Sequence, residues 1–115
     1  MHEFSLVEQV LGAAIEVAEE NGGRPIARIE LEIGALQQVV PDALAFAFEA
    51  AKAGTPAENA ALAWTEVPAE VRCPACAHIY APDDVFWVCP KCNAPGGKAV
   101  SGDDLILSKV VLEEP

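Results

Sequence analysis

Four cysteines are the residues of this chain best suited to hold a metal ion. They form two CxxC pairs, Cys73–Cys76 and Cys89–Cys92, with twelve residues between the pairs. A CxxC turn presents two thiolates from one tight loop, and two facing turns supply the four soft ligands that tetrahedral zinc prefers. Because four thiolates leave no open position for water, the spacing predicts a structural zinc site and not a catalytic one.

The same spacing leaves an alternative metal open, because iron in a rubredoxin-like site takes the same four thiolates. A redox dithiol normally opens a helix in a βαβ unit, which neither pair does, and disulfides are rare in a reducing cytoplasm. The residue after each pair often needs a left-handed backbone, which Asn93 tolerates better than Ala77. His78 follows closely enough to contact a thiolate or to add a pH response, although such a histidine is more often an ordinary surface residue.

The chain start offers a second and different set of metal ligands. The Met1 amine and the His2 amide nitrogen can close a five-membered chelate ring on a metal, and the His2 imidazole can add a six-membered ring. Such a nitrogen-rich set favours planar Ni(II) or Cu(II). A terminal histidine is usually mobile and solvated, so these residues by themselves give the nickel hypothesis little weight.

Composition argues against several classes of function. Eighteen carboxylates outnumber seven Lys and Arg residues, for a formal net charge of -11, which disfavours binding to the phosphates of nucleic acids. The sequence lacks the pattern of a signal peptide and any apolar run of about eighteen residues, so we expect a cytoplasmic protein without a membrane span. No nucleophile-elbow, Walker or zincin motif is present, and we expect no enzyme activity.

Two amphipathic helices are predicted around a strand. Residues 4–21 have an apolar stripe and end at Asn21-Gly22-Gly23. Residues 27–33 alternate apolar and charged side chains, as in a strand with one buried face. A second helix should begin at Pro41, with Asp42 favourably placed for the helix dipole, and should end by Gly54.

The cysteines lie between two further predicted strands. Residues 61–67 and 105–112 both have strand composition, but their imperfect alternation leaves the buried face undetermined. Residues 72–98 have too few aliphatic side chains for a core of their own and need a metal to hold them. We therefore predict a discontinuous α/β domain, residues 1–71 and 99–115, with a zinc-binding module at 72–98.

Several stretches together resemble the HypA/HybF hydrogenase maturation factors. They are the start Met1-His2-Glu3-Phe4-Ser5, LEIGALQQVVPDAL (31–44), FAFEAAKAGT (46–55), the doubled CxxC and SGDDLIL (101–107). The similarity covers nearly the whole chain, with the stretches in the same order. It implies an α+β fold, two helices packed on a small mixed sheet with an inserted four-cysteine zinc-ribbon-like module, which agrees with the elements predicted above.

The resemblance also implies a function and a set of site residues. The expected function is a nickel metallochaperone that delivers Ni(II) for [NiFe]-hydrogenase maturation, with urease as a further recipient, and the expected partners are the GTPase HypB and the hydrogenase large subunit. His2 would bind nickel with main-chain nitrogens at Met1 and Glu3, supported by the Glu3 side chain. The four cysteines would hold structural Zn(II).

Three points remain open from the sequence. Some members of the family carry a histidine after the second cysteine pair, where this chain has Asn93-Ala94-Pro95, so a two-histidine pH response at the zinc is not expected. The chain can be a monomer or a homodimer. The alternative functions are a zinc-ribbon protein-binding module without nickel delivery and a rubredoxin-like electron-transfer protein.

Overall fold

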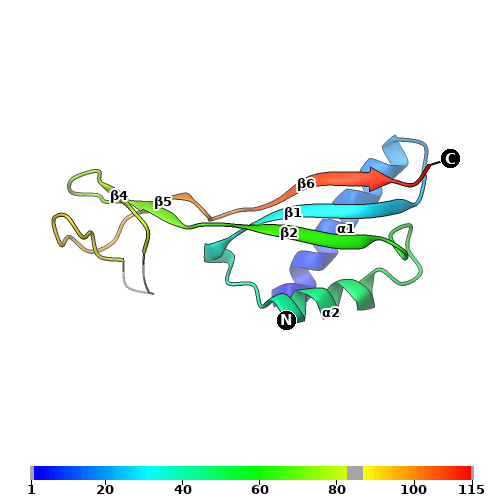
Figure 1. Cartoon of the computed structure of the whole chain (residues 1–115), viewed down its shortest axis with the longest axis horizontal. Helices are drawn as coiled ribbons and strands as arrows, with labels where there is room; N and C mark the ends of the chain where they lie inside the picture. The colour runs from blue at the N-terminus through cyan, green and yellow to red at the C-terminus, as the bar shows by residue number, and fades with distance from the viewer. Residues whose placement is uncertain (1, 83–86, 115) are drawn as a thin grey trace. The chain divides into compact units, whose positions relative to one another are not determined.

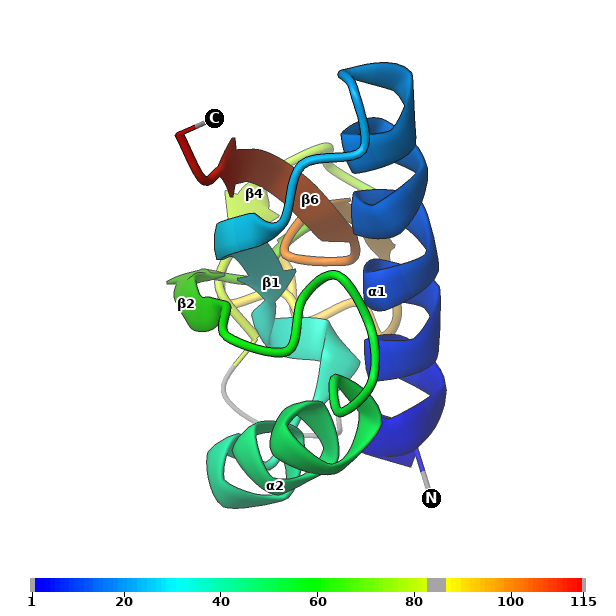
Figure 2. The ribbon, with the colours of Figure 1, turned by 90° about the vertical axis from the view of Figure 1, so that its right-hand side faces the viewer.

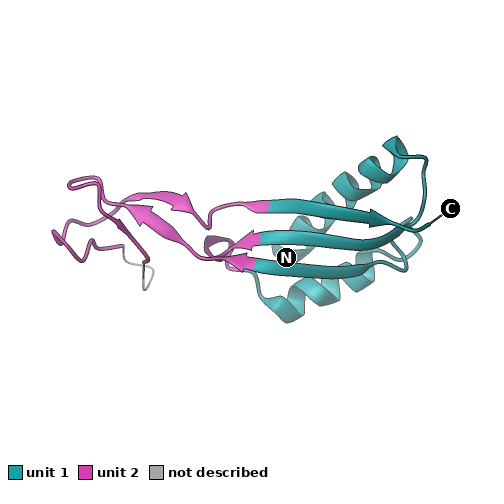
Figure 3. Ribbon diagram, turned by 45° about the horizontal axis from the view of Figure 1, so that its top comes forward, with its two compact units in different colours: residues 1–32, 39–65, 106–115 teal, residues 33–38, 66–105 magenta. Residues whose placement is uncertain are grey.

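The computed structural model describes residues 2–82 and 87–114. Along the chain, the elements follow in the order α1, β1, η1, α2, β2, β3, β4, β5 and β6 (Figure 1). The chain divides into two compact units (Figure 3). Unit 1 comprises residues 1–32, 39–65 and 106–115, and unit 2 comprises residues 33–38 and 66–105. The chain start therefore belongs to unit 1, and all four cysteines belong to unit 2.

Helix α1, His2–Glu20, supplies the first apolar face of unit 1. Its five buried residues recur on one face, as the sequence predicts: Val7, Val10, Leu11, Ala14 and Ala18. The helix ends where Gly22 and Gly23 take positive φ angles of 95° and 69°. The Gly23 N–H donates to the Ala18 carbonyl at 2.8 Å and so satisfies an acceptor at the helix end. The predicted helix is confirmed, with its start at His2.

A three-stranded sheet packs against the helices of unit 1. Strand β1, Ile26–Gly34, lies between β2, Ala61–Val67, and β6, Leu105–Leu112. Figure 3 draws β1 and β2 in the same direction and β6 in the opposite one, so the sheet is mixed. Both helices cover the same face of this sheet (Figure 2). The predicted α+β class, with two helices on a small mixed sheet, is confirmed.

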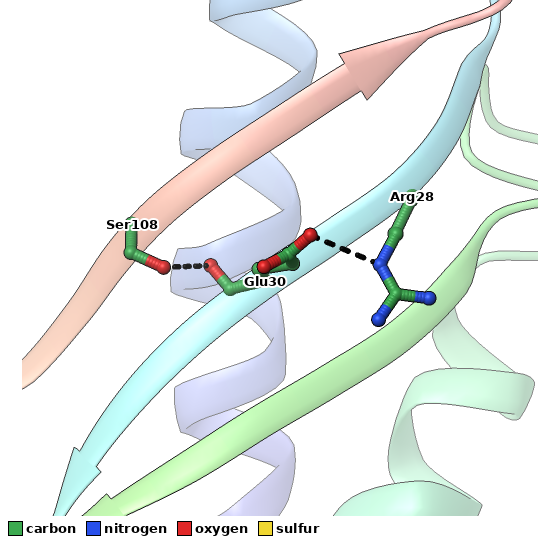
Figure 4. Close-up of polar contacts among 3 residues, drawn as sticks. All are labelled: Arg28, Glu30 and Ser108. Atoms are coloured by element: carbon green, nitrogen blue, oxygen red, sulfur yellow. Dashed lines mark hydrogen bonds and ion pairs between the residues drawn. The ribbon is translucent and has the colours of Figure 1, made fainter.

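Three polar residues of β1 and β6 lie together on the face of the sheet away from the helices (Figure 4). On β1, the Arg28 Nε donates to the Glu30 Oε2 at 3.0 Å. From β6, the Ser108 hydroxyl donates to the Glu30 main-chain carbonyl at 3.0 Å. This arrangement confirms the predicted alternation, since Ile29 and Leu31, on either side of Glu30 in the chain, are buried on the opposite face.

Helix α2, Pro41–Ala51, begins at the predicted proline. Proline suits the first turn because it has no N–H to satisfy there. The helix buries Leu44, Ala47 and Phe48. It stops at Lys52, whose N–H donates to the Phe48 carbonyl, and the chain then turns toward β2.

Unit 2 contains a second sheet that the sequence did not predict. Strand β3, Glu70–Arg72, pairs antiparallel with β4, Ile79–Tyr80, and with β5, Lys98–Ser101. Its buried cluster is small and consists of Val71, Cys73, Tyr80 and Cys89, with Trp87 and Ala94 packed against it. The unit contains the whole described part of the predicted module at 72–98. The predicted domain boundaries at 71/72 and 98/99 stay a prediction.

Two glycines allow backbone segments of unit 2 to approach closely. A Cβ on Gly34 would overlap the carbonyl group of Gly102, and a Cβ on Gly102 would lie 2.6 Å from the Ala69 Cα. Gly102 also has a φ of 77°, which favours glycine. The Leu36 N–H donates to the Gly102 carbonyl at 2.9 Å. This contact fixes the short helix η1, Ala35–Gln37, within the unit.

Among the described helices, none has the length and apolar character needed to cross a bilayer.

Candidate metal centres

The four cysteine sulfur atoms lie close enough together to share one metal ion. All four lie within 4.8 Å of one another. The Cys73 and Cys92 Sγ atoms are 3.5 Å apart, and the Cys76 and Cys89 Sγ atoms are 3.7 Å apart. A tetrahedral zinc with Zn–S bonds of about 2.3 Å requires sulfur separations of about 3.8 Å. The thiols therefore fit a four-sulfur metal site without a large rearrangement.

The first CxxC turn has the backbone of a metal-binding knuckle. The Ala77 N–H donates to the Cys73 carbonyl at 3.0 Å, and the Cys73 N–H donates to the His78 carbonyl at 2.9 Å. Within the turn, the Ala75 N–H points at the Cys73 Sγ at 3.4 Å. Backbone N–H groups directed at a sulfur stabilise its thiolate form.

The second turn repeats this pattern. The Asn93 N–H donates to the Cys89 carbonyl at 2.9 Å, and the Cys89 N–H donates to the Ala94 carbonyl at 3.0 Å. The Lys91 N–H points at the Cys89 Sγ at 3.4 Å. Because both turns make the same three contacts, the two halves of the site are built by equivalent local geometry.

The residue after each pair has a left-handed backbone, as predicted. The φ angle is 63° at Ala77 and 61° at Asn93. This conformation returns each N–H to the carbonyl of the first cysteine in its pair, which closes the turn. Asparagine adopts the left-handed region readily, whereas alanine adopts it at a cost of about 1 kcal/mol or more.

Burial divides the four cysteines into two kinds. Cys73 and Cys89, the first cysteine of each pair, are 2% and 0% exposed and belong to the buried cluster of unit 2. Cys76 and Cys92 are exposed. Tyr80 packs in the same cluster, and its hydroxyl donates to the Gly96 carbonyl at 3.0 Å. Tyr80 could not be predicted from the sequence, because a lone tyrosine outside a clear strand pattern gives no signal.

The electrostatics of the cluster favour ionisation of one thiol and oppose ionisation of another. The backbone N–H of Cys76 is the main cause that lowers the pKa of Cys73 to about 6, aided by the Ala75 N–H. At Cys92 the backbone N–H of Ala94 acts to lower the pKa, but the hydrogen-bonded Cys73 thiol, the local desolvation of the sulfur and the other two thiols outweigh it and raise the pKa to about 12. Without a cation, therefore, the four sulfur atoms do not all carry charge, and a dication would supply the missing attraction.

The pKa of Tyr80 responds to the same surroundings. Burial of the phenol raises its pKa, and the charges of Cys89, Cys73 and Cys92 raise it further. Tyr80 is therefore a neutral hydrogen-bond donor beside the thiols. Within the described residues, the His78 side chain makes no hydrogen bond to a thiolate, and this residue contributes its main-chain carbonyl to the first turn.

The proposed nickel residues lie at the start of unit 1. Met1 lies outside the described residues. His2 and Glu3 form the first turn of α1, and His2 is exposed. In the described part of the chain, the four cysteines are the one group of three or more His, Cys, Asp or Glu side chains placed to share a metal. Among the described residues, the first turn of α1 therefore contributes no such group of three side chains.

Contacts that the sequence did not reveal attach this first turn to α2. The Val40 N–H donates to the Glu3 Oε2 at 3.1 Å. This hydrogen bond is the main cause that lowers the pKa of Glu3, which is therefore ionised at neutral pH. The Phe4 and Phe46 rings meet edge to face, with 6.4 Å between centroids. Asp42 is exposed in the first turn of α2, two residues after Val40.

Comparisons with known proteins agree on one family. Residues 1–112 match the family described as "Hydrogenase/urease nickel incorporation, metallochaperone, hypA". The chain is 41% identical to the hydrogenase maturation factor HypA of Chloroflexus aggregans over the full length of both chains. It is 40% identical to that of Geobacter sulfurreducens over 98% of this chain and 100% of the relative.

A solved structure shares the fold. The solution structure of the Ni metallochaperone HypA from Helicobacter pylori superposes with a TM-score of 0.72, at 24% sequence identity. The similarity covers 97% of this chain and 97% of that one. The arrangement of elements described above is therefore found in a protein of known structure.

Proposed function

This chain belongs to the HypA family of nickel-incorporation metallochaperones, and we propose that it carries Ni(II) on its N-terminus for the maturation of [NiFe]-hydrogenase. The observation that carries the proposal is the position of His2 at the very start of α1, where Glu3 is held against α2. Urease is a second recipient in this proposal. The protein acts without catalysing a reaction, in the cytoplasm.

The proposed nickel ligands are nitrogen atoms. They are the Met1 amine, main-chain nitrogens of the first residues and the His2 imidazole, a set suited to planar Ni(II). The first N–H groups of a helix have no acceptor within the helix. Amide nitrogens of the first turn can therefore release their protons to solvent and bind a metal without breaking hydrogen bonds of α1. The ionised Glu3 carboxylate, fixed by Val40, adds negative charge beside the dication.

The four cysteines hold a structural zinc in this proposal. The sulfur separations of 3.5 and 3.7 Å are close to the sulfur–sulfur distances around a tetrahedral zinc ion. Zinc would supply the charge that lets all four thiols ionise together and would close both turns of unit 2. Iron suits the same four sulfur atoms. An absorption spectrum separates the two metals, because ferric iron bound by thiolates is red and zinc is colourless.

Delivery requires that the nickel be bound less firmly than the zinc. A few donors at a chain end must be ordered when the metal binds, and this ordering lowers the affinity. Nickel can then pass by stepwise ligand exchange to a partner, whose donors replace those of His2 and the backbone. The partners in this proposal are the nickel-handling GTPase HypB and the hydrogenase large subunit.

The decisive experiment is a nickel titration of the untagged, zinc-loaded protein. His2→Ala should weaken Ni(II) binding at least tenfold, because it removes the imidazole donor. An N-terminal extension should do the same by converting the Met1 amine into an amide. The matched control is His78→Ala, since His78 is the other histidine of the chain. This variant should bind nickel like the unaltered protein.

The outcomes separate the proposal from its alternatives. Unchanged nickel affinity in both the His2→Ala variant and the extended protein would show that the N-terminal site is wrong. Loss of affinity in His78→Ala alone would move the nickel site to unit 2. A protein that binds zinc but no nickel would support a zinc-ribbon module that only docks other proteins.

A further inference from the structure

Helix α2 presents an exposed face that is unusually apolar for a surface helix. Its exposed positions include Ala45, Phe46 and Ala50, and Val40 precedes them at the start of the helix. Phe46 is 66% exposed and Val40 is 56% exposed. A surface helix normally carries charged or polar residues on its outer side. We define Val40, Phe46 and the two alanines as the α2 patch.

Phe46 is held in a defined position although it is exposed. The ring of Phe4 packs edge-on against it, with an interplanar angle of 80°. A ring fixed in this way loses little conformational freedom when a partner covers it. Exposed aromatic residues of this kind supply much of the binding energy at protein interfaces. Phe46 is therefore suited to be the anchor of a docking surface.

The α2 patch adjoins the proposed nickel terminus. Glu3 accepts a hydrogen bond from Val40, and the Phe4 ring contacts Phe46. The two residues that contact the patch, Glu3 and Phe4, therefore directly follow His2 in the chain. The first turn of α1 lies beside the start of α2 (Figure 1). A protein seated on the patch would meet the metal donors without further movement of α1.

Carboxylates border the patch along the same helix. Asp42 and Glu49 stand four residues before and three residues after Phe46, on the outer side of α2. Glu49 forms an ion pair of 2.7 Å with Lys52, and Asp42 has no counter-ion among the described residues. With the ionised Glu3, the border is acidic. It complements a partner whose apolar socket is surrounded by Lys and Arg side chains.

We propose that the α2 patch is the docking surface for the protein that exchanges nickel with the N-terminus, with Phe46 inserted in an apolar socket that has a basic border. This inference rests on the proposed function and names the surface through which it operates. The acidic border guides the partner into place, and Phe46 supplies most of the affinity.

The test compares two exposed apolar residues of unit 1. The probe is the purified HypB GTPase of the same organism, titrated against the full-length, zinc- and nickel-loaded protein. Phe46→Ser should weaken the complex about 30-fold, the size expected for an interface anchor. Ile106→Ser is the matched control, because Ile106 is 48% exposed on β6. This control should leave the affinity unchanged.

The border is tested by charge. Glu49→Gln should slow association, and added salt should reduce the difference from the unaltered protein. Nickel affinity should be unchanged in Phe46→Ser, since no proposed nickel donor is altered, and circular dichroism should confirm that this variant is folded. A loss of nickel binding in His2→Ala together with normal HypB binding would support both proposals.

Three results would overturn the inference while leaving the nickel site intact. The first is Phe46→Ser binding HypB as tightly as the unaltered protein does. The second is an equal loss of affinity in Ile106→Ser. The third is a self-associating protein in which Phe46→Ser dissociates the copies and leaves HypB binding unaffected, because the patch would then bind a second copy of this chain. An unaltered protein that does not bind HypB would also overturn it.

Discussion

At the scale of single residues, the two metal-binding turns differ in how well their sequences suit their backbone. Ala77 and Asn93 occupy equivalent positions with nearly equal φ angles of 63° and 61°. Asparagine is common in the left-handed region, whereas the Cβ of alanine meets a backbone oxygen there. The first turn therefore stores strain that the second turn avoids.

Ala77→Gly should stabilise the zinc-loaded protein. Removing the Cβ relieves about 1–2 kcal/mol of left-handed strain. The greater conformational freedom of glycine in the unfolded chain destabilises the folded state by about 0.5–1 kcal/mol and so offsets part of this gain. The net gain should be about 0.5–1 kcal/mol in the free energy of unfolding of unit 2, measured by denaturant titration in the presence of zinc. Asn93→Ala should shift stability by a similar amount in the opposite direction.

The control for this prediction is Ala75→Gly in the same turn. Ala75 is exposed and is not among the residues with positive φ, and its N–H contact with the Cys73 sulfur does not need a side chain. Glycine at this position should destabilise unit 2 by about 0.5–1 kcal/mol. If Ala77→Gly lowered the free energy of unfolding of unit 2 as much as Ala75→Gly does, strain at Ala77 would be negligible.

Zinc affinity should depend on pH through Cys73 in particular. With a pKa of about 6, Cys73 has already lost its proton at neutral pH and releases none when zinc binds. Cys92, with a pKa of about 12, still carries its proton and must release it. Affinity therefore falls as the pH falls, and below a pH of about 6 zinc must displace one more proton.

This dependence can be measured by competition with a chromophoric chelator from about pH 5 to about pH 8. The slope of the logarithm of the zinc association constant against pH should increase by about one as the pH falls through the pKa of Cys73. A slope that stays constant over this range would contradict a lowered pKa at Cys73. Ala75→Pro, which removes an N–H directed at that sulfur, should move the change in slope to higher pH.

At the scale of elements, long periodic segments could be predicted and short ones could not. Helix α1 has five buried positions on one face, and the pattern of charges and apolar residues along β1 is regular. Strands β3, β4 and β5 contain three, two and four residues. Segments this short have no measurable periodicity, and their pairing is set by the turns around the cysteines.

The two outer strands show why a strand can be predicted while its buried face cannot. Strands β2 and β6 have the predicted bounds 61–67 and 105–112, but both are edge strands of a three-stranded sheet. Neither contains a residue that is fully buried, so the alternation is weak. The central strand β1 is covered by the helices, and its alternation is correspondingly clear.

The candidate sites follow the same logic. Cysteine spacing predicted the four-sulfur cluster because a CxxC turn fixes its own ligands locally. The hydrogen bond from Val40 to Glu3 joins residues 37 positions apart, and the Phe4–Phe46 contact is similarly distant in the chain. No local pattern encodes such contacts, so the attachment of the first turn of α1 to α2 could be found only in the structure.

At the scale of the whole molecule, the two compact units depend on different sources of stability. The core of unit 1 is formed by apolar residues of its helices and sheet, among them Val7, Ile29, Leu44 and Phe48. Two of the four residues in the buried cluster of unit 2, Cys73 and Cys89, are proposed zinc ligands. We therefore expect a cluster this small to need the metal to remain folded, whereas the buried residues of unit 1 include no proposed ligand.

Removal of zinc should therefore unfold unit 2 selectively. After treatment with a strong chelator under reducing conditions, amide hydrogen exchange should become fast in β3, β4 and β5 and stay slow in α1 and β1. Cys92→Ser should reproduce this pattern without a chelator, because it removes one exposed ligand and leaves the buried cluster otherwise unaltered. If α1 lost protection together with β3, the stability of both units would depend on the metal. If neither α1 nor β3 lost protection, the four cysteines would not be a structural metal site.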